Sequence, residues 1–138
     1  MEEKLRQKYI EAQSIDKQAQ QIQEQLSQVN QQIENLNSVI ESLEELKTIK
    51  EGDELLVPIT NGIFFEAIAK KTENVKINVG SETVLEKGID DAKKMLKKQE
   101  DELNEIRERL NEFSQELAIK SERVHKEAQE ALKEYENV

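Results

Sequence analysis

The residues that could do chemistry are a single histidine and a large excess of carboxylates. His125 has Glu122 and Lys126 close by, in a chain of 138 residues that holds 30 Asp and Glu, 20 Lys and Arg, and no Cys. A protein metal site requires several ligands in a fixed geometry, and one histidine with a common acidic neighbour does not supply them. The sequence therefore predicts a solvated surface histidine and no metal site.

Catalytic signatures are also absent from the sequence. Adjacent carboxylates such as Asp90 and Asp91 are abundant, but on solvated helices they lack the burial that separates the pKa values of an acid–base pair. The sequence has no phosphate-binding G-x-x-x-x-G-K-[ST] loop and no G-x-G-x-x-G turn. We therefore expect a protein that is not an enzyme and that needs no cofactor.

The charge balance limits the possible partners. The formal net charge is −10, whereas nucleic acids and anionic membranes attract basic surfaces, so neither is an expected partner. The longest apolar runs are three residues, and the charged start of the chain has no apolar signal region. We expect a cytoplasmic protein.

A heptad pattern occupies residues 1–51. It predicts a coiled-coil helix, because apolar residues recur at alternating spacings of three and four without Gly or Pro. One heptad position holds Leu5, Ala12, Ala19, Leu26, Ile33 and Ile40, and the position three residues later holds Ile15, Ile22, Val29, Leu36 and Leu43. The pattern slips at Lys47, and Gly52 is expected to end the helix.

A second heptad pattern follows in residues 89–138. Its first series is Ile89, Leu96, Leu103, Leu110, Leu117, Val124 and Ala131, and its companion series is Ala92, Ile106 and Phe113. These residues are expected to pack in the coiled-coil seam. The companion series ends in Lys120, Glu127 and Glu134, which predicts loosely paired helix ends. Two arms of about equal length suit an antiparallel pair.

The stretch 52–88 between the arms holds all four glycines and the only proline. Alternating apolar residues predict strands at 54–59, 63–69, 75–79 and 82–87, which short turns join into two β-hairpins. Pro58 lacks a backbone donor, so its strand is expected to be an edge or to carry a bulge. So small a sheet cannot form its own core, and we expect it to pack on helix roots and on another subunit. The assembly residues predicted there are Leu55, Val57, Ile59, Phe64, Phe65, Ile68, Val75, Ile77, Val79 and Val84.

Apolar residues lie near the two chain ends, most of them outside the seam. Exposed groups of this kind on a polar helix pair could hold many partners weakly. The residues expected to bind such partners are Leu5, Tyr9, Ile10, Ile119, Ala128, Leu132 and Tyr135.

The order of these motifs resembles one family. Leu56-Val57-Pro58-Ile59 before Gly62, the run 75–80 ending in glycine, and the run 84–87 leading into Asp91-Ala92 are similar to motifs of the α-type subunits of prefoldin. The resemblance covers the whole chain, 1–138, as one domain. It implies an α+β fold in which an antiparallel coiled-coil hairpin of two helices is joined by two β-hairpins that form an oligomerisation barrel.

The resemblance also implies a function. In this family, two α-type and four β-type subunits form a hexamer that holds non-native client proteins at the coil tips, without ATP, and passes them to a group II chaperonin. One branch of α-like subunits instead assembles with itself into filaments, so a filament or scaffold subunit is a second hypothesis. A simple coiled-coil tether is a third, which the two hairpins disfavour because a tether needs only a turn.

Overall fold

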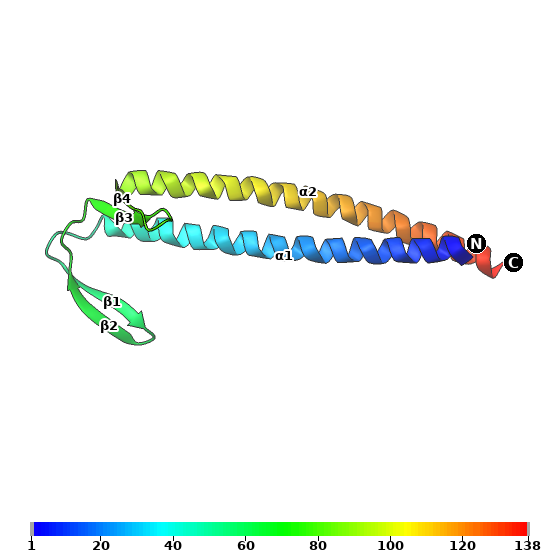
Figure 1. Cartoon of the computed structure of the whole chain (residues 1–138), viewed down its shortest axis with the longest axis horizontal. Helices are drawn as coiled ribbons and strands as arrows, with labels where there is room; N and C mark the ends of the chain where they lie inside the picture. Colours follow the sequence, from blue (N-terminus) through cyan, green and yellow to red (C-terminus); the bar gives the residue numbers. More distant parts are fainter. Residues whose placement is uncertain (1, 138) are drawn as a thin grey trace. The chain divides into compact units, whose positions relative to one another are not determined.

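The computed structural model describes residues 2–137, and these form two long helices that flank four short strands in the sequence (Figure 1). No helix within 2–137 combines the length and the apolar character that crossing a membrane requires. The elements are α1 (Glu2–Leu46), β1 (Glu54–Thr60), β2 (Ile63–Ile68), β3 (Asn74–Asn78), β4 (Val84–Gly88) and α2 (Ile89–Glu136).

Helix α1 ends at Leu46, so the prediction that it continues to Gly52 was wrong. The amides of Lys47 and Thr48 donate to carbonyls three residues earlier, at 3.2 and 3.1 Å, which tightens the chain out of the α-helix. This is the point where the apolar heptad position passes to Lys47. Gly52 instead lies in the connection to β1, with a φ of 91°.

Strands β1 and β2 form an antiparallel two-stranded sheet, as predicted. The register shifts between Pro58 and Thr60, which confirms the irregularity expected at the proline. Gly62 closes the turn with a φ of 77°, a conformation that L side chains adopt at a cost.

Strands β3 and β4 form a second antiparallel sheet. Strand β4 begins at Val84, so the prediction of a strand from residue 82 was wrong. Ser81 and Glu82 have positive φ values of 51° and 60° and belong to the turn. The amide of Val79 donates to the carbonyl of Thr83 at 3.0 Å, which closes this longer turn.

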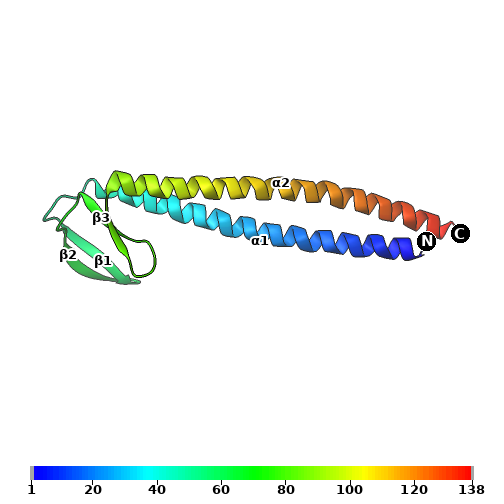
Figure 2. The same cartoon turned by 45° about the horizontal axis from the view of Figure 1, so that its top comes forward.

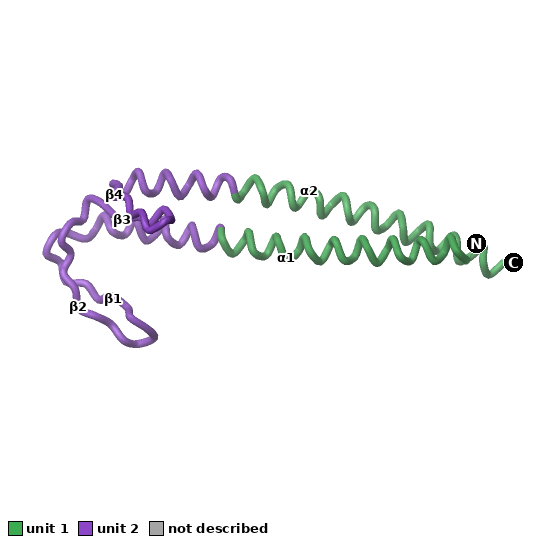
Figure 3. The backbone as a smooth tube through the Cα atoms, viewed as in Figure 1, with its two compact units in different colours: residues 1–32, 103–138 green, residues 33–102 purple. Residues whose placement is uncertain are grey.

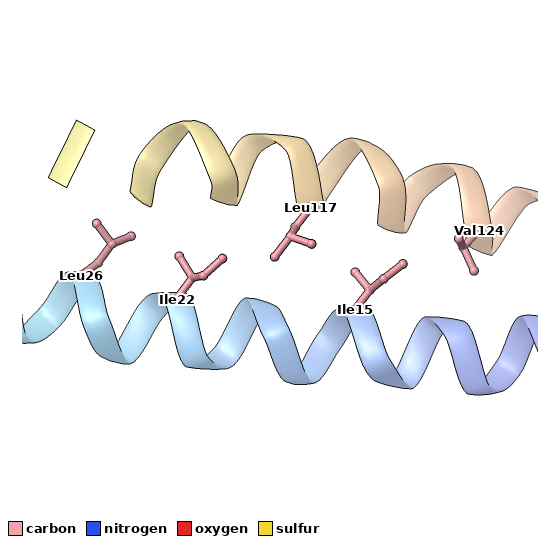
Figure 4. Packing of buried hydrophobic residues seen from close by; sticks show 5 residues of the cluster. All are labelled: Ile15, Ile22, Leu26, Leu117 and Val124. Atoms are coloured by element: carbon pink, nitrogen blue, oxygen red, sulfur yellow. The ribbon is translucent and has the colours of Figure 1, made fainter. Parts of the chain in front are cut away.

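The chain divides into two units (Figure 3), which we call the end unit (residues 1–32 and 103–138) and the hairpin unit (residues 33–102). In the end unit the helices run antiparallel, because Lys8 pairs with Glu127 whereas Asn30 contacts Arg107. The buried seam of this unit consists of Ile15, Ile22, Leu26, Leu117 and Val124, with the α1 side chains directed at α2 and the α2 side chains directed at α1 (Figure 4).

In the hairpin unit a smaller core joins the second hairpin to the helix roots, which are the C-terminal end of α1 and the N-terminal end of α2. Leu43, Ile89 and Ala92 are buried, and Val75 and Ile77 of β3 pack against them. Both views place β3 beside the helix roots (Figures 1 and 2). Cross-helix ion pairs lie at the same level, at 2.5 Å between Lys93 Nζ and Glu44 Oε2 and at 2.8 Å between Lys47 Nζ and Asp90 Oδ1. The second hairpin therefore packs on its own helices, as the sequence suggested.

Candidate functional site

The end unit exposes large apolar side chains near the N-terminus of α1, near the C-terminus of α2 and, at Ile119, further from that end of α2. Tyr9 is 65% exposed and Ile119 is 70% exposed. Ile10, Leu132 and Tyr135 are also exposed, whereas Leu5 and Ala128 are half-buried. The structure thus places five of the seven residues predicted for partner binding on the surface, and we call these five the end surface: Tyr9, Ile10, Ile119, Leu132 and Tyr135.

Beside the end surface the seam consists largely of alanine side chains. Ala12 and Ala19 pack against the core from α1, and Ala131 of α2 is only 3% exposed. The helices therefore remain paired as far as Ala131. Alanines bury little apolar area, so this part of the seam adds less stability than the leucine and isoleucine layers do.

A cross-helix ion pair occupies the seam next to the alanines. Lys8 Nζ lies 2.5 Å from Glu127 Oε2 and 3.5 Å from Glu11 Oε2. The hydrogen bond that Lys8 donates to Glu127 raises the pKa of Lys8 and lowers the pKa of Glu127 from their ordinary values. Both groups are therefore charged at neutral pH, and they join the two helices beside seam positions that alanines occupy.

The first hairpin exposes a second apolar surface. Both faces of β1 and β2 are open, and Phe65 is 63% exposed and Ile68 70% exposed. Of the residues predicted for assembly, Val57, Ile59, Phe64, Phe65, Ile68, Val79 and Val84 are exposed, whereas Leu55, Val75 and Ile77 are half-buried. Val75 and Ile77 contact the chain's own helix roots.

Three exposed strand residues were missed as assembly candidates: Leu56, Ile63 and Leu85. The signal for Leu56 and Leu85 was present in the sequence, because each is next to another apolar residue in its strand. Adjacent apolar residues point to opposite faces of a strand, which indicates a sheet covered on both sides. We call the exposed apolar side chains of β1 and β2 the hairpin surface: Leu56, Val57, Ile59, Ile63, Phe64, Phe65 and Ile68.

His125 lies where the sequence predicted, on an exposed helix face. Its Nδ1 donates to the carbonyl oxygen of Ser121 at 2.8 Å, within the same helix. Within residues 2–137, no group of three or more His, Cys, Asp and Glu side chains is arranged to hold a metal ion.

Ile106 and Phe113 do not lie in the seam, so their predicted burial was wrong. They are 43% and 50% exposed. The α1 residues Ile22 and Leu26 pack with Leu117, and this first series of α2 fills the seam. Ile106 and Phe113 are left at the edge of the helix pair, where they border a groove of about 470 Å³, whereas Ala92 of the same series is buried in the hairpin unit.

Two long helices that flank two antiparallel β-hairpins form the fold of prefoldin subunits. Residues 15–134 match the family model described as a prefoldin subunit, and the chain belongs to the prefoldin family. The two hairpins are the number expected of an α-type subunit, and the curated relatives are of that type.

Two such relatives are the subunits named prefoldin subunit alpha of Thermofilum pendens and of Methanococcus maripaludis strain S2. The first is 31% identical over 77 residues, which are 55% of this chain and 60% of the relative. The second is 32% identical over 69 residues, which are 50% of this chain and 48% of the relative. The matches thus span only about half of the relatives' length.

The structure is also similar to filamentous PFD from Methanocaldococcus jannaschii, solved by cryo-EM. The TM-score is 0.75 at 25% identity, and the match covers 85% of this chain and 98% of the other. This likeness extends over nearly the whole fold, beyond the segments that align with the curated relatives.

Proposed function

We propose that the chain is a chaperone subunit that holds non-native proteins, without ATP, through the end surface of its two helices. The single observation that carries this proposal is the exposure of Tyr9, Ile10, Ile119, Leu132 and Tyr135 on otherwise polar helices. Apolar groups at that position attract any unfolded segment that exposes apolar side chains, because the hydrophobic effect is not directional.

The strength of such holding follows from the size of the end surface. Burial of one large apolar side chain contributes roughly 1.5–3 kcal/mol when it is complete, and less for these partly covered groups. One helix pair therefore holds a client weakly and reversibly. Several copies in one oligomer bind a long unfolded chain more tightly, because the later contacts form within the complex.

The hairpin surface supports the assembly that this avidity requires. Its exposed apolar side chains would be covered by other subunits, either β-type prefoldin subunits or further copies of this chain. By analogy with the family, we propose that the hairpins of several subunits form a barrel in the cytoplasm, and that clients pass to a group II chaperonin. None of these steps requires a catalytic residue.

The test compares an end-surface variant with a matched control. The variant carries Tyr9→Gln, Ile119→Gln and Leu132→Gln, and the control carries Gln13→Asn, Glu116→Gln and Glu130→Gln at exposed positions of the same helices. Light scattering of an aggregating client measures holding without ATP, and native mass spectrometry measures assembly. The proposal predicts that only the end-surface variant loses holding, with its oligomer mass unchanged. Equal holding by variant and control would refute it.

A second candidate function is a self-assembling filament subunit, which the likeness to filamentous PFD favours. Hairpin contacts that do not close on themselves would produce such fibres. Electron microscopy of the purified chain separates the two candidates. Long fibres of the chain alone support the filament, and small closed oligomers support the hexamer subunit.

A further inference from the structure

The groove beside Ile106 and Phe113 lies within the end unit but apart from the end surface. Its floor is apolar, with Ile22 and Leu110 next to the two exposed side chains. Ile106 and Phe113 occupy heptad positions that normally face a partner helix, yet about half of each side chain is open to solvent. The groove therefore offers apolar area that the two helices of this chain leave uncovered.

The rim of the groove is polar but carries no carboxylate. Gln18, Gln21 and Gln25 of α1 line one side at spacings of three and four, which place them on one helix face. Arg109 lies on the other side, with its Nη2 3.9 Å from Glu105 Oε2. None of the eight lining residues is acidic, in a chain with a net charge of −10. Glutamine amides both donate and accept hydrogen bonds, so they suit the backbone of any peptide.

We infer that this groove holds a short, extended apolar segment of the same non-native chain that the end surface binds. From Gln18 to Gln25 the helix advances about 10 Å at 1.5 Å per residue. An extended peptide covers that length with about three residues. The apolar side chains of the segment would contact Ile106 and Phe113, and its backbone would face the glutamines.

A second copy of this chain fits the groove less well. Eight residues line it, whereas a stable protein–protein interface uses about 20–30 residues on each side. A second copy also brings another net charge of −10, which opposes close approach outside a large apolar contact.

The inference rests on the proposed holding function, and the test separates the two. Because the chain has no cysteine, a single Gln21→Cys, Tyr9→Cys or Gln23→Cys substitution carries a photoactivatable crosslinker at one position. Gln21 lines the groove, Tyr9 belongs to the end surface, and Gln23 is an exposed control on the same helix. The probe is reduced, carboxymethylated α-lactalbumin, which stays unfolded.

Crosslinks to the probe from positions 21 and 9, but not from 23, are expected. Crosslinks from position 9 alone would overturn the groove and leave the end surface standing. Crosslinks from position 21 to another copy of the chain would also overturn it. The absence of any crosslink to the probe would overturn both the groove and the proposed function.

A second measurement uses substitution without a label. Phe113→Gln removes about half a buried phenylalanine from the complex and is expected to weaken probe binding about fivefold. Glu116→Gln, on the same helix and outside the groove, is the control and is expected to leave binding unchanged. Circular dichroism checks that both variants keep their helix content. Unchanged binding by a folded Phe113→Gln variant would contradict the inference.

Discussion

Replacement of Leu117 by alanine should lower the free energy of unfolding of the helix pair, because Leu117 is a seam residue. Leu117 is 6% exposed and packs with Ile15, Ile22, Leu26 and Val124 in the seam of the end unit. Leu→Ala substitutions in cores cost about 2–5 kcal/mol, from lost burial and from the cavity that remains. A two-helix seam has solvent on both sides and can partly collapse, so we expect about 2–3 kcal/mol, at the lower end of that range.

Ile119→Ala is the matched control, two residues further along α2. Ile119 is 70% exposed, so its loss should change the free energy of unfolding by less than about 0.5 kcal/mol. Alanine also has the higher helix propensity, which offsets part of any loss. Urea denaturation followed by far-UV circular dichroism, at one fixed protein concentration, measures both variants. Equal destabilisation by the two variants would refute the assignment of seam and surface.

Three further predictions concern the ion pair and the hairpins. The hydrogen bond from Lys8 lowers the folded-state pKa of Glu127, so the ion pair should stabilise the fold above the ordinary pKa of 4.5 and lose this effect as pH falls through the lower folded-state pKa. Glu127→Gln should therefore lower the urea midpoint at neutral pH but not in strong acid. An equal drop in the midpoint at both pH values would contradict this pH dependence. Gly62→Ala should cost about 1 kcal/mol because of its positive φ, whereas Gly88→Ala, with ordinary space for a Cβ, should cost less in the same urea assay. Phe65→Lys should reduce the native oligomer mass while helix content by circular dichroism stays constant, and an unchanged mass would exclude β2 from assembly.

The order of the elements was predictable because each depends on local pattern. Heptads predict helices, and both arms are helical. The glycines of 52–88 predict turns, and Pro58 predicts an irregular strand; the observed hairpins and the register shift after Pro58 agree with both. Element ends were less predictable. The tightened turn after Leu46 and the positive φ of Glu82 depend on backbone hydrogen bonds, and the residue types at these positions do not predict such bonds.

The candidate site was predictable only in part. Apolar residues outside the heptad seam, such as Tyr9 and Ile119, were recognisable as surface groups from spacing alone. Ile106 and Phe113 have the spacing of seam residues, and their exposure depends on how α1 is rotated against α2. That rotation is set by the packing of many side chains together, and a single-sequence pattern does not specify it.

Amide hydrogen exchange of the chain, with and without an unfolded client, tests most directly whether the end surface holds the client. Exchange at helix ends reports local opening, which a bound client would suppress. We expect slower exchange in the N-terminal part of α1 around Tyr9 and in the last turn of α2 around Tyr135, with residues 54–68 unchanged. Slower exchange confined to residues 54–68, with the helix ends unaffected, would show that the hairpins hold the client and that the end surface does not.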